Sequence, residues 1–174
     1  MELEMNGVIA YEKYNGLVIE SEEPLYVLAN RKGYDFKYAT KFDNHYYNNP
    51  SLKRFKIEKD GILVISTVEY LEKKYFTNIS LILDVKLDNL TMINLYRTVV
   101  ESIASTSWMA NAINKDKLDN KVGNFYNIIF IACRSEADVN ISFDISLFYE
   151  VKELVNEALE KSFDNLNMDN KGGV

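Results

Sequence analysis

Residues 77–113 place one buried strand directly before a long amphipathic helix, and this order constrains the fold more than any other feature. The run Asn78–Val85 is apolar almost throughout, which is typical of a strand buried on both faces and central in its sheet. Asp88 is a favourable N-cap, so a helix is predicted from about Asn89 to Ile113. A second apolar run, Phe125–Cys133, predicts another buried strand. We expect the two strands to be interior neighbours in one sheet.

The N-terminal part of the chain predicts a small antiparallel meander. Its strands are expected at Gly7–Tyr11, Gly16–Glu20 and Leu25–Ala29. Turn signals at Asn15-Gly16 and Glu22-Glu23-Pro24 separate them.

The middle of the chain continues this strand pattern. A strand is expected near Phe36–Phe42, and the turn Lys59-Asp60-Gly61 separates strands at Arg54–Glu58 and Ile62–Thr67. The segment Val68–Tyr75 fits either a short helix or a strand extension.

The C-terminal part predicts a second amphipathic helix, Ile145–Phe163, followed by a frayed tail over residues 164–174. With 174 residues and 47% hydrophobic content, the chain is long enough for one sizeable core. Hairpins followed by strand, helix, strand and helix predict an α+β fold. We expect a single domain over residues 1–163, with a mixed sheet, an N-terminal antiparallel meander and two main helices packed on the sheet.

Charge and hydropathy exclude some classes of partner. The formal net charge is −6 and the basic patches are short, so nucleic-acid binding is not expected. The apolar runs are shorter than the ~20 residues that span a bilayer, so no membrane association is expected. The acidic start Met1-Glu2-Leu3-Glu4 does not resemble a signal peptide, and a cytoplasmic location is expected.

A polar stripe follows one side of the first predicted helix. Asn94, Thr98, Glu101 and Ser105 fall within an arc of roughly 60° at about 100° per residue. Most apolar side chains are expected on the opposite side: Met92, Leu95, Tyr96, Val99, Val100, Ile103 and Ala110. The stripe is either a solvated surface or the wall of a recess.

Motifs for several common chemistries are missing from the sequence. It contains no GxGxxG, GxxxxGK[ST] or GxSxG pattern, and one histidine with one cysteine cannot form a His/Cys zinc site. No metal site and no cofactor are expected. Cys133 lies in an apolar run and is interpreted as a small buried hydrophobe. His45 lies in a predicted polar loop, where it is either structural or the one general acid or base suited to neutral pH.

Several short motifs, taken in order, resemble the adenosylcobinamide amidohydrolases of cobalamin salvage. The strongest is the helix pattern Asn94-x3-Thr98-x2-Glu101, which follows a strand that ends in Asp84. The other matching segments are Asn44-His45 with Pro50, Asn78-Ile79, Leu87-Asp88, Gly123, Asn127–Cys133 and Phe148-Tyr149-Glu150-Val151. The resemblance therefore extends over nearly the whole chain.

The chain also departs from the family pattern. The glycine-rich early loop of the family is reduced to Lys32-Gly33, and bulky residues replace small ones in Ser66-Thr67-Val68-Glu69-Tyr70. Ser102-Ile103 replaces the family's Ala-Lys, and Gly123-Asn124-Phe125-Tyr126-Asn127 lacks the hydroxyls and the carboxylate of the corresponding family turn. The fold expectation is less affected by these changes than the activity.

The resemblance implies hydrolysis of the amide between the corrin ring and its aminopropanol arm. In that reaction Glu101 would activate water or orient the substrate, and His45 would protonate the leaving amine. Asn78 and Asn94 would donate hydrogen bonds to the oxyanion or to corrin amides. The full set of implied substrate-binding residues is Asn44, Asn78, Asp84, Asn94, Thr98, Gly123 and Asn127.

The competing interpretation is a protein without catalytic activity. The chain has 12 tyrosines and 9 phenylalanines, many of them in predicted loops. Aromatic side chains of this kind suit a flat ligand or a subunit interface. A catalytically inactive corrinoid- or small-ligand-binding relative, or a structural homo-oligomer, is therefore the alternative.

Overall fold

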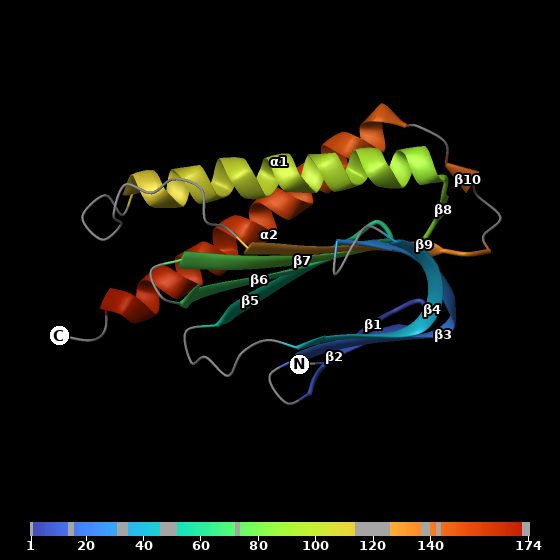
Figure 1. The fold of residues 1–174 in the computed structure, drawn as a ribbon, viewed down its shortest axis with the longest axis horizontal. Helices are drawn as coiled ribbons and strands as arrows, with labels where there is room; N and C mark the ends of the chain where they lie inside the picture. The colour runs from blue at the N-terminus through green and yellow to red at the C-terminus, as the bar shows by residue number, and fades with distance from the viewer. Residues whose placement is uncertain are drawn as a thin grey trace.

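The computed structural model describes residues 2–13, 16–30, 35–45, 52–71, 74–113, 126–136, 140–141 and 144–171. The elements in these ranges are β1 (Glu2–Met5), β2 (Val8–Lys13), β3 (Gly16–Ala29), β4 (Asp35–His45), β5 (Lys53–Lys59), β6 (Ile62–Leu71), β7 (Lys74–Leu83), β8 (Lys86–Leu87), α1 (Asn89–Ile113), β9 (Tyr126–Arg134), β10 (Asn140–Ile141) and α2 (Ile145–Lys171). They form an α+β fold with a curled mixed sheet and two helices, as the sequence predicts (Figure 1).

The main sheet has the strand order β1-β2-β3-β9-β7-β6-β5, and β4 pairs with β3. Its strands pair antiparallel except for β7 and β9, which pair in parallel. Helix α1 lies between these two strands in the chain, because a parallel pair needs a long crossover connection. Both β7 and β9 have neighbours on each side, which confirms the prediction that the two apolar runs form interior strands.

Strand β3 folds the sheet into two layers. Its pairing with β4 shifts register between Glu20 and Leu25, and the residues between them include Pro24. Residues 16–20 pair with β2 in one layer, and residues 25–29 pair with β9 in the other (Figure 1). The prediction of two separate strands at this position was wrong, since the exposed turn residues lie at a bend within one continuous strand.

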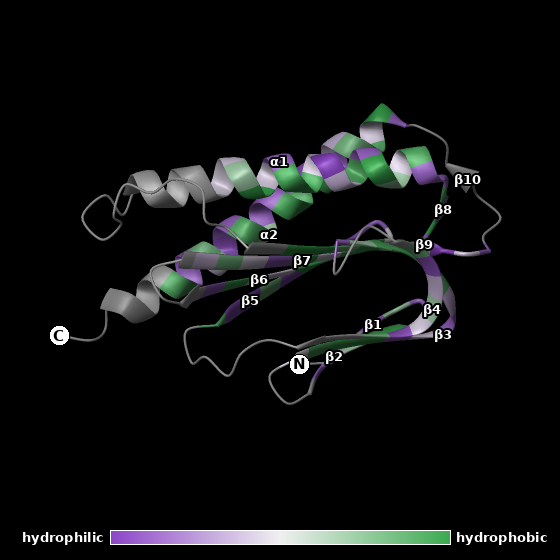
Figure 2. Ribbon diagram, in the orientation of Figure 1, coloured by the Kyte–Doolittle hydropathy of each residue, from purple (hydrophilic) through white to green (hydrophobic). Residues whose placement is uncertain are grey.

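The two helices cover one face of the layer formed by β9, β7, β6 and β5 (Figure 1). In their coloured parts, both helices alternate hydrophobic and hydrophilic residues, as amphipathic helices do (Figure 2). We call this side the helix face. Its core includes Val64, Val68, Ile79, Leu81, Leu83, Leu95, Val99, Ile129, Val155 and Leu159.

The other face of the same strands packs against the layer that contains β1 and β2, and we call it the inner face. Because side chains alternate along a strand, neighbouring residues such as Val64 and Ile65 belong to different faces. The inner core includes Met5, Val8, Ala10, Leu17, Ile19, Leu63, Ile65, Ile82 and Phe130.

Some element boundaries differ from the prediction. Helix α1 has the predicted limits, whereas α2 continues past Phe163 to Lys171 and buries Leu166. Strand β1 was not predicted, and the described residues of Val68–Tyr75 belong to the paired strands β6 and β7. The predicted turn at Asp60-Gly61 is present, with both residues at positive φ.

In the described part of the chain, neither helix combines the length and the apolar composition needed to cross a bilayer.

Candidate functional site

The predicted polar stripe lies on the outer side of α1. Asn94 and Thr98 are half-buried, while Glu101 and Ser105 are exposed. The Thr98 hydroxyl donates a hydrogen bond to the Asn94 carbonyl oxygen at 3.1 Å, so this hydroxyl is already bound to its own helix. On the opposite side Met92, Leu95, Val99 and Ile103 are buried as predicted. Val100 was placed wrongly because it is 37% exposed, and the side chain of Ala110 lies outside the described part of the structure.

Asp84 is engaged in a structural network at the bent end of the sheet. Its Oδ1 accepts a hydrogen bond from Arg134 Nε at 2.6 Å, and its Oδ2 accepts one from the Asn6 side-chain amide. Arg134 also donates to the Asn6 carbonyl oxygen. The carboxylate therefore ties the β1–β2 turn to the ends of β7 and β9.

Asn78 lies on the inner face in a group of polar side chains that are buried except for Glu12. It pairs in register with Thr67, which pairs with Arg54 on the next strand. Arg54 Nε donates to Thr67 Oγ1 at 3.2 Å, and Arg54 forms an ion pair with Glu12 across the two layers. Glu69 follows Thr67 on the same face of β6. We call Glu12, Arg54, Thr67, Glu69 and Asn78 the inner polar cluster.

The remaining predicted residues are placed by backbone register alone. Asn44 pairs with Leu17 and His45 with Gly16, at the end of β4 that is remote from the bend. Asn127 pairs with Thr77 in β9. Gly123 lies outside the described residues.

The structure does not bring Asn78 and Glu101 together. Asn78 lies on the same side of β7 as the inner-face residue Ile82. Helix α1 packs over the opposite side, where its Leu95 belongs to the helix-face core. The sheet therefore separates the two side chains. Asp84 is six residues beyond Asn78 along β7, a distance of about 20 Å at 3.3 Å per residue.

A group of aromatic side chains lies beside the start of α1, and we call it the aromatic shelf. The Tyr26 ring is stacked 5.5 Å from Phe36 and lies 4.8 Å from Tyr38, measured between ring centroids. The Tyr26 hydroxyl donates to Asn89 Oδ1 at 2.6 Å. Burial is the main cause that raises the pKa of Tyr26, with a further contribution from Tyr38.

The shelf is accessible at its outer edge because the Tyr38 side chain is 64% exposed. Sequence reasoning noted the aromatic residues near Phe36 but not that they form one surface with Tyr26 and Asn89. The available signal was the alternation of Phe36 and Tyr38, which places both rings on one side of β4.

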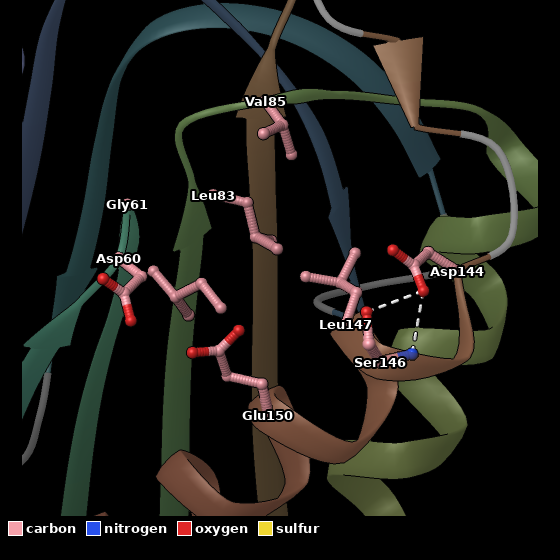
Figure 3. Close-up of a pocket in the computed structure, with 9 residues that line it drawn as sticks. Asp60, Gly61, Leu83, Val85, Asp144, Ser146, Leu147 and Glu150 are labelled. Atoms are coloured by element: carbon pink, nitrogen blue, oxygen red, sulfur yellow. Dashed lines mark hydrogen bonds between the residues drawn. The ribbon is translucent and has the colours of Figure 1, made fainter.

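A pocket of about 180 Å³ lies between the β5–β6 turn, the end of β7 and the start of α2 (Figure 3). It is lined by Asp60, Gly61, Ile62, Leu83, Val85, Asp144, Ser146, Leu147 and Glu150, none of which was a predicted site residue. Asp144 accepts hydrogen bonds from the Ser146 amide and hydroxyl, and these bonds lower its pKa. Lys59 Nζ is 3.6 Å from Glu150. Asp144 therefore caps the start of α2, and Glu150 is paired with Lys59.

Cys133 is not placed for nucleophilic chemistry. Its sulfur is buried 3.8 Å from Met92 Sδ, and burial raises the pKa of the thiol to about 11. This environment agrees with its interpretation as a small buried hydrophobe. Among the described side chains, no group of three or more His, Cys, Asp or Glu residues is arranged to hold a metal ion.

Comparison with known proteins adds no family assignment: the sequence matches no protein family, and no curated protein is significantly similar to it.

Proposed function

We propose that this protein binds a flat, amide-bearing ligand of the corrinoid class, as a relative of the adenosylcobinamide amidohydrolases that does not hydrolyse it. The observation that carries the proposal is the aromatic shelf. The exposed Tyr38 ring beside the half-buried rings of Tyr26 and Phe36 suits a flat apolar partner. The Asn89 amide beside Tyr26 offers hydrogen bonds to amide arms. A corrin ring combines a flat macrocycle with such arms.

The separation of the predicted catalytic residue Glu101 from predicted substrate-binding residues argues against hydrolysis. Amide hydrolysis requires an activated water, oxyanion stabilisation and a proton donor around one carbonyl group. Asn78 and Glu101 lie on opposite sides of the sheet, and Asp84 is bonded to Arg134. These side chains cannot surround a single amide in this arrangement.

Retained hydrolysis is the second candidate, and one observation favours it. Asn94, Thr98 and Glu101 still share one side of α1, with the carboxylate exposed to solvent. A substrate lying along α1 could reach these three groups without contacting the inner face.

The test is a titration with adenosylcobinamide followed by mass spectrometry of the ligand after long incubation. We expect wild-type protein to bind it and to return it intact. Tyr38→Ala removes a ring contact worth about 0.5–1.5 kcal/mol and should weaken binding about 2- to 10-fold. Tyr149→Ala is the matched control, because Tyr149 is 66% exposed on α2 and lies outside the shelf.

Each result has a defined meaning. Binding without product, weakened by Tyr38→Ala alone, supports the proposal. A hydrolysed product would overturn the non-hydrolytic part and favour the second candidate. Failure to bind corrinoids would reject the functional inference from the family, and the aromatic shelf would then be better explained as an interface in a homo-oligomer.

A further inference from the structure

Glu69 is a buried residue, and one oxygen of its carboxylate, Oε1, has no described hydrogen-bond partner. The residue is 3% exposed, and the Oε1 atom is itself inaccessible to solvent. Burying a carboxylate without a partner costs several kcal/mol, and such groups in native proteins are usually paired. The position therefore calls for a specific explanation.

The surroundings of Glu69 are polar on one side. Thr67 is two residues earlier on the same face of β6 and is 1% exposed. Phe76 is directly opposite Glu69 on β7, so Asn78 is its diagonal neighbour, at a distance of about 7–8 Å between Cα atoms. Asn78 is 5% exposed and carries an amide oxygen that can accept hydrogen bonds.

The charges of the inner polar cluster do not balance. Among its described residues are two carboxylates, Glu12 and Glu69, and one cation, Arg54. The Arg54 guanidinium pairs with Glu12 and donates to Thr67. A carboxylate oxygen that is buried and accepts no bond favours a ligand that brings positive charge together with N–H donors.

We propose that the inner polar cluster binds a small monovalent cation with N–H donors, an ammonium ion or a primary alkylammonium group, with Glu69 Oε1 as the main acceptor. The ligand is small because Thr67, Glu69 and Asn78 are almost fully buried. This site is separate from the aromatic shelf, since the shelf packs against the helix-face core and bonds to α1. It does not depend on corrinoid binding.

The experiment measures thermal unfolding in methylammonium chloride, tetramethylammonium chloride and potassium chloride at equal ionic strength. Tetramethylammonium carries the same charge without N–H donors. We expect only methylammonium to raise Tm specifically, by roughly 2–4 °C when the site is mostly occupied. Glu69→Gln should remove this specific rise because the substitution removes the negative charge while keeping the shape.

Glu58→Gln is the matched control, because Glu58 is an exposed carboxylate on the neighbouring strand β5. It should retain the full methylammonium response. A second measurement needs no variant: isotope-labelled ammonium bound to wild-type protein should show N–H protons that exchange slowly with water.

Three results would overturn the proposal. Equal Tm values in all three salts, together with fast exchange of labelled ammonium, would show that the cluster binds no such cation. A rise in potassium chloride equal to that in methylammonium would show that N–H donors are not recognised. A methylammonium response that persists in Glu69→Gln would place the binding elsewhere.

Discussion

The two faces of the central strands differ in the kind of buried polar group that they leave without a described hydrogen bond. On the helix face, Ser66 Oγ lies 2.6 Å from both the Ala158 carbonyl oxygen and Ser162 Oγ, so β6 and α2 are joined by buried hydrogen bonds. On the inner face, Glu69 is equally buried but its Oε1 has no described partner. On the helix face the buried atoms without a described partner, such as Thr77 Oγ1 and Ser102 Oγ, belong to neutral hydroxyl groups, whereas on the inner face such an atom belongs to a carboxylate.

The largest effect is expected in the helix-face core. Leu83 and Ile129 lie on the adjacent interior strands β7 and β9, and each is 1% exposed. Leu83→Ala or Ile129→Ala should therefore lower the free energy of unfolding by ~2–5 kcal/mol. Denaturant unfolding measures this loss. Tyr149→Ala on the surface is the control, and a loss below about 1 kcal/mol in both core variants would contradict the assigned burial.

The next largest effect should come from the hydrogen bonds between β6 and α2. Ser66→Ala removes the hydroxyl that bonds to Ala158 and Ser162, and leaving these partners buried without a donor should cost ~1–3 kcal/mol. The free energy of unfolding would report it. Ser146→Ala, at an exposed site, is the control, and equal stability of the two variants would mean that the Ser66 hydroxyl does not join β6 and α2 as its distances indicate.

A smaller effect is expected at the start of α1. The Thr91 amide donates to Asp88 Oδ1 at 2.7 Å, so Asp88→Ala should cost ~0.5–2 kcal/mol, and Asp88→Asn less. This bond lowers the pKa of Asp88 below its usual value. The associated stabilisation is therefore present above about pH 4, the pKa range of an unfolded Asp, and is lost as the pH falls through the lower folded pKa.

The pH dependence can be measured directly. An NMR titration of the Asp88 carboxyl should give a midpoint below that of a model peptide, and the stability difference between wild type and Asp88→Ala should shrink at acidic pH. A midpoint at or above the model value would contradict the cap.

The sequence predicted those elements whose pattern is set locally. The long apolar runs identified β7 and β9 as interior strands, because burial on two faces leaves a direct signal in the sequence. Asp88 identified the start of α1 at Asn89, because an N-cap residue is also a direct signal. Long-range features left weaker signals. The bend in β3 was interpreted as a turn because Glu22-Glu23-Pro24 suits either a turn between two strands or a bend within one strand. Only the pairing of β3 with β2 before this segment and with β9 after it distinguishes the two possibilities.

The candidate sites were harder to predict for the same reason. The helix period correctly grouped Asn94, Thr98 and Glu101, but no local pattern shows that the sheet separates them from Asn78. Asp84 was interpreted as a substrate contact, whereas its partners Asn6 and Arg134 come from distant parts of the chain. The inner polar cluster likewise depends on strand pairing, since its members are spread from Glu12 to Asn78.

The smallest effect on stability is expected at Glu101, where the same substitution also separates the two functional candidates. Glu101 is exposed on α1, so Glu101→Gln should change the free energy of unfolding by no more than about 0.5 kcal/mol.

The Glu101→Gln substitution keeps the shape of the side chain but removes the charge that can accept a proton from water. If the protein hydrolyses a corrinoid amide through this residue, the loss must appear in kcat while corrinoid binding and Tm stay nearly unchanged. His45→Ala should then slow the reaction less, if His45 only assists the leaving amine. If the protein does not hydrolyse the amide, Glu101 belongs to a solvated helix surface. We then expect wild type and Glu101→Gln to bind adenosylcobinamide equally and to leave it intact.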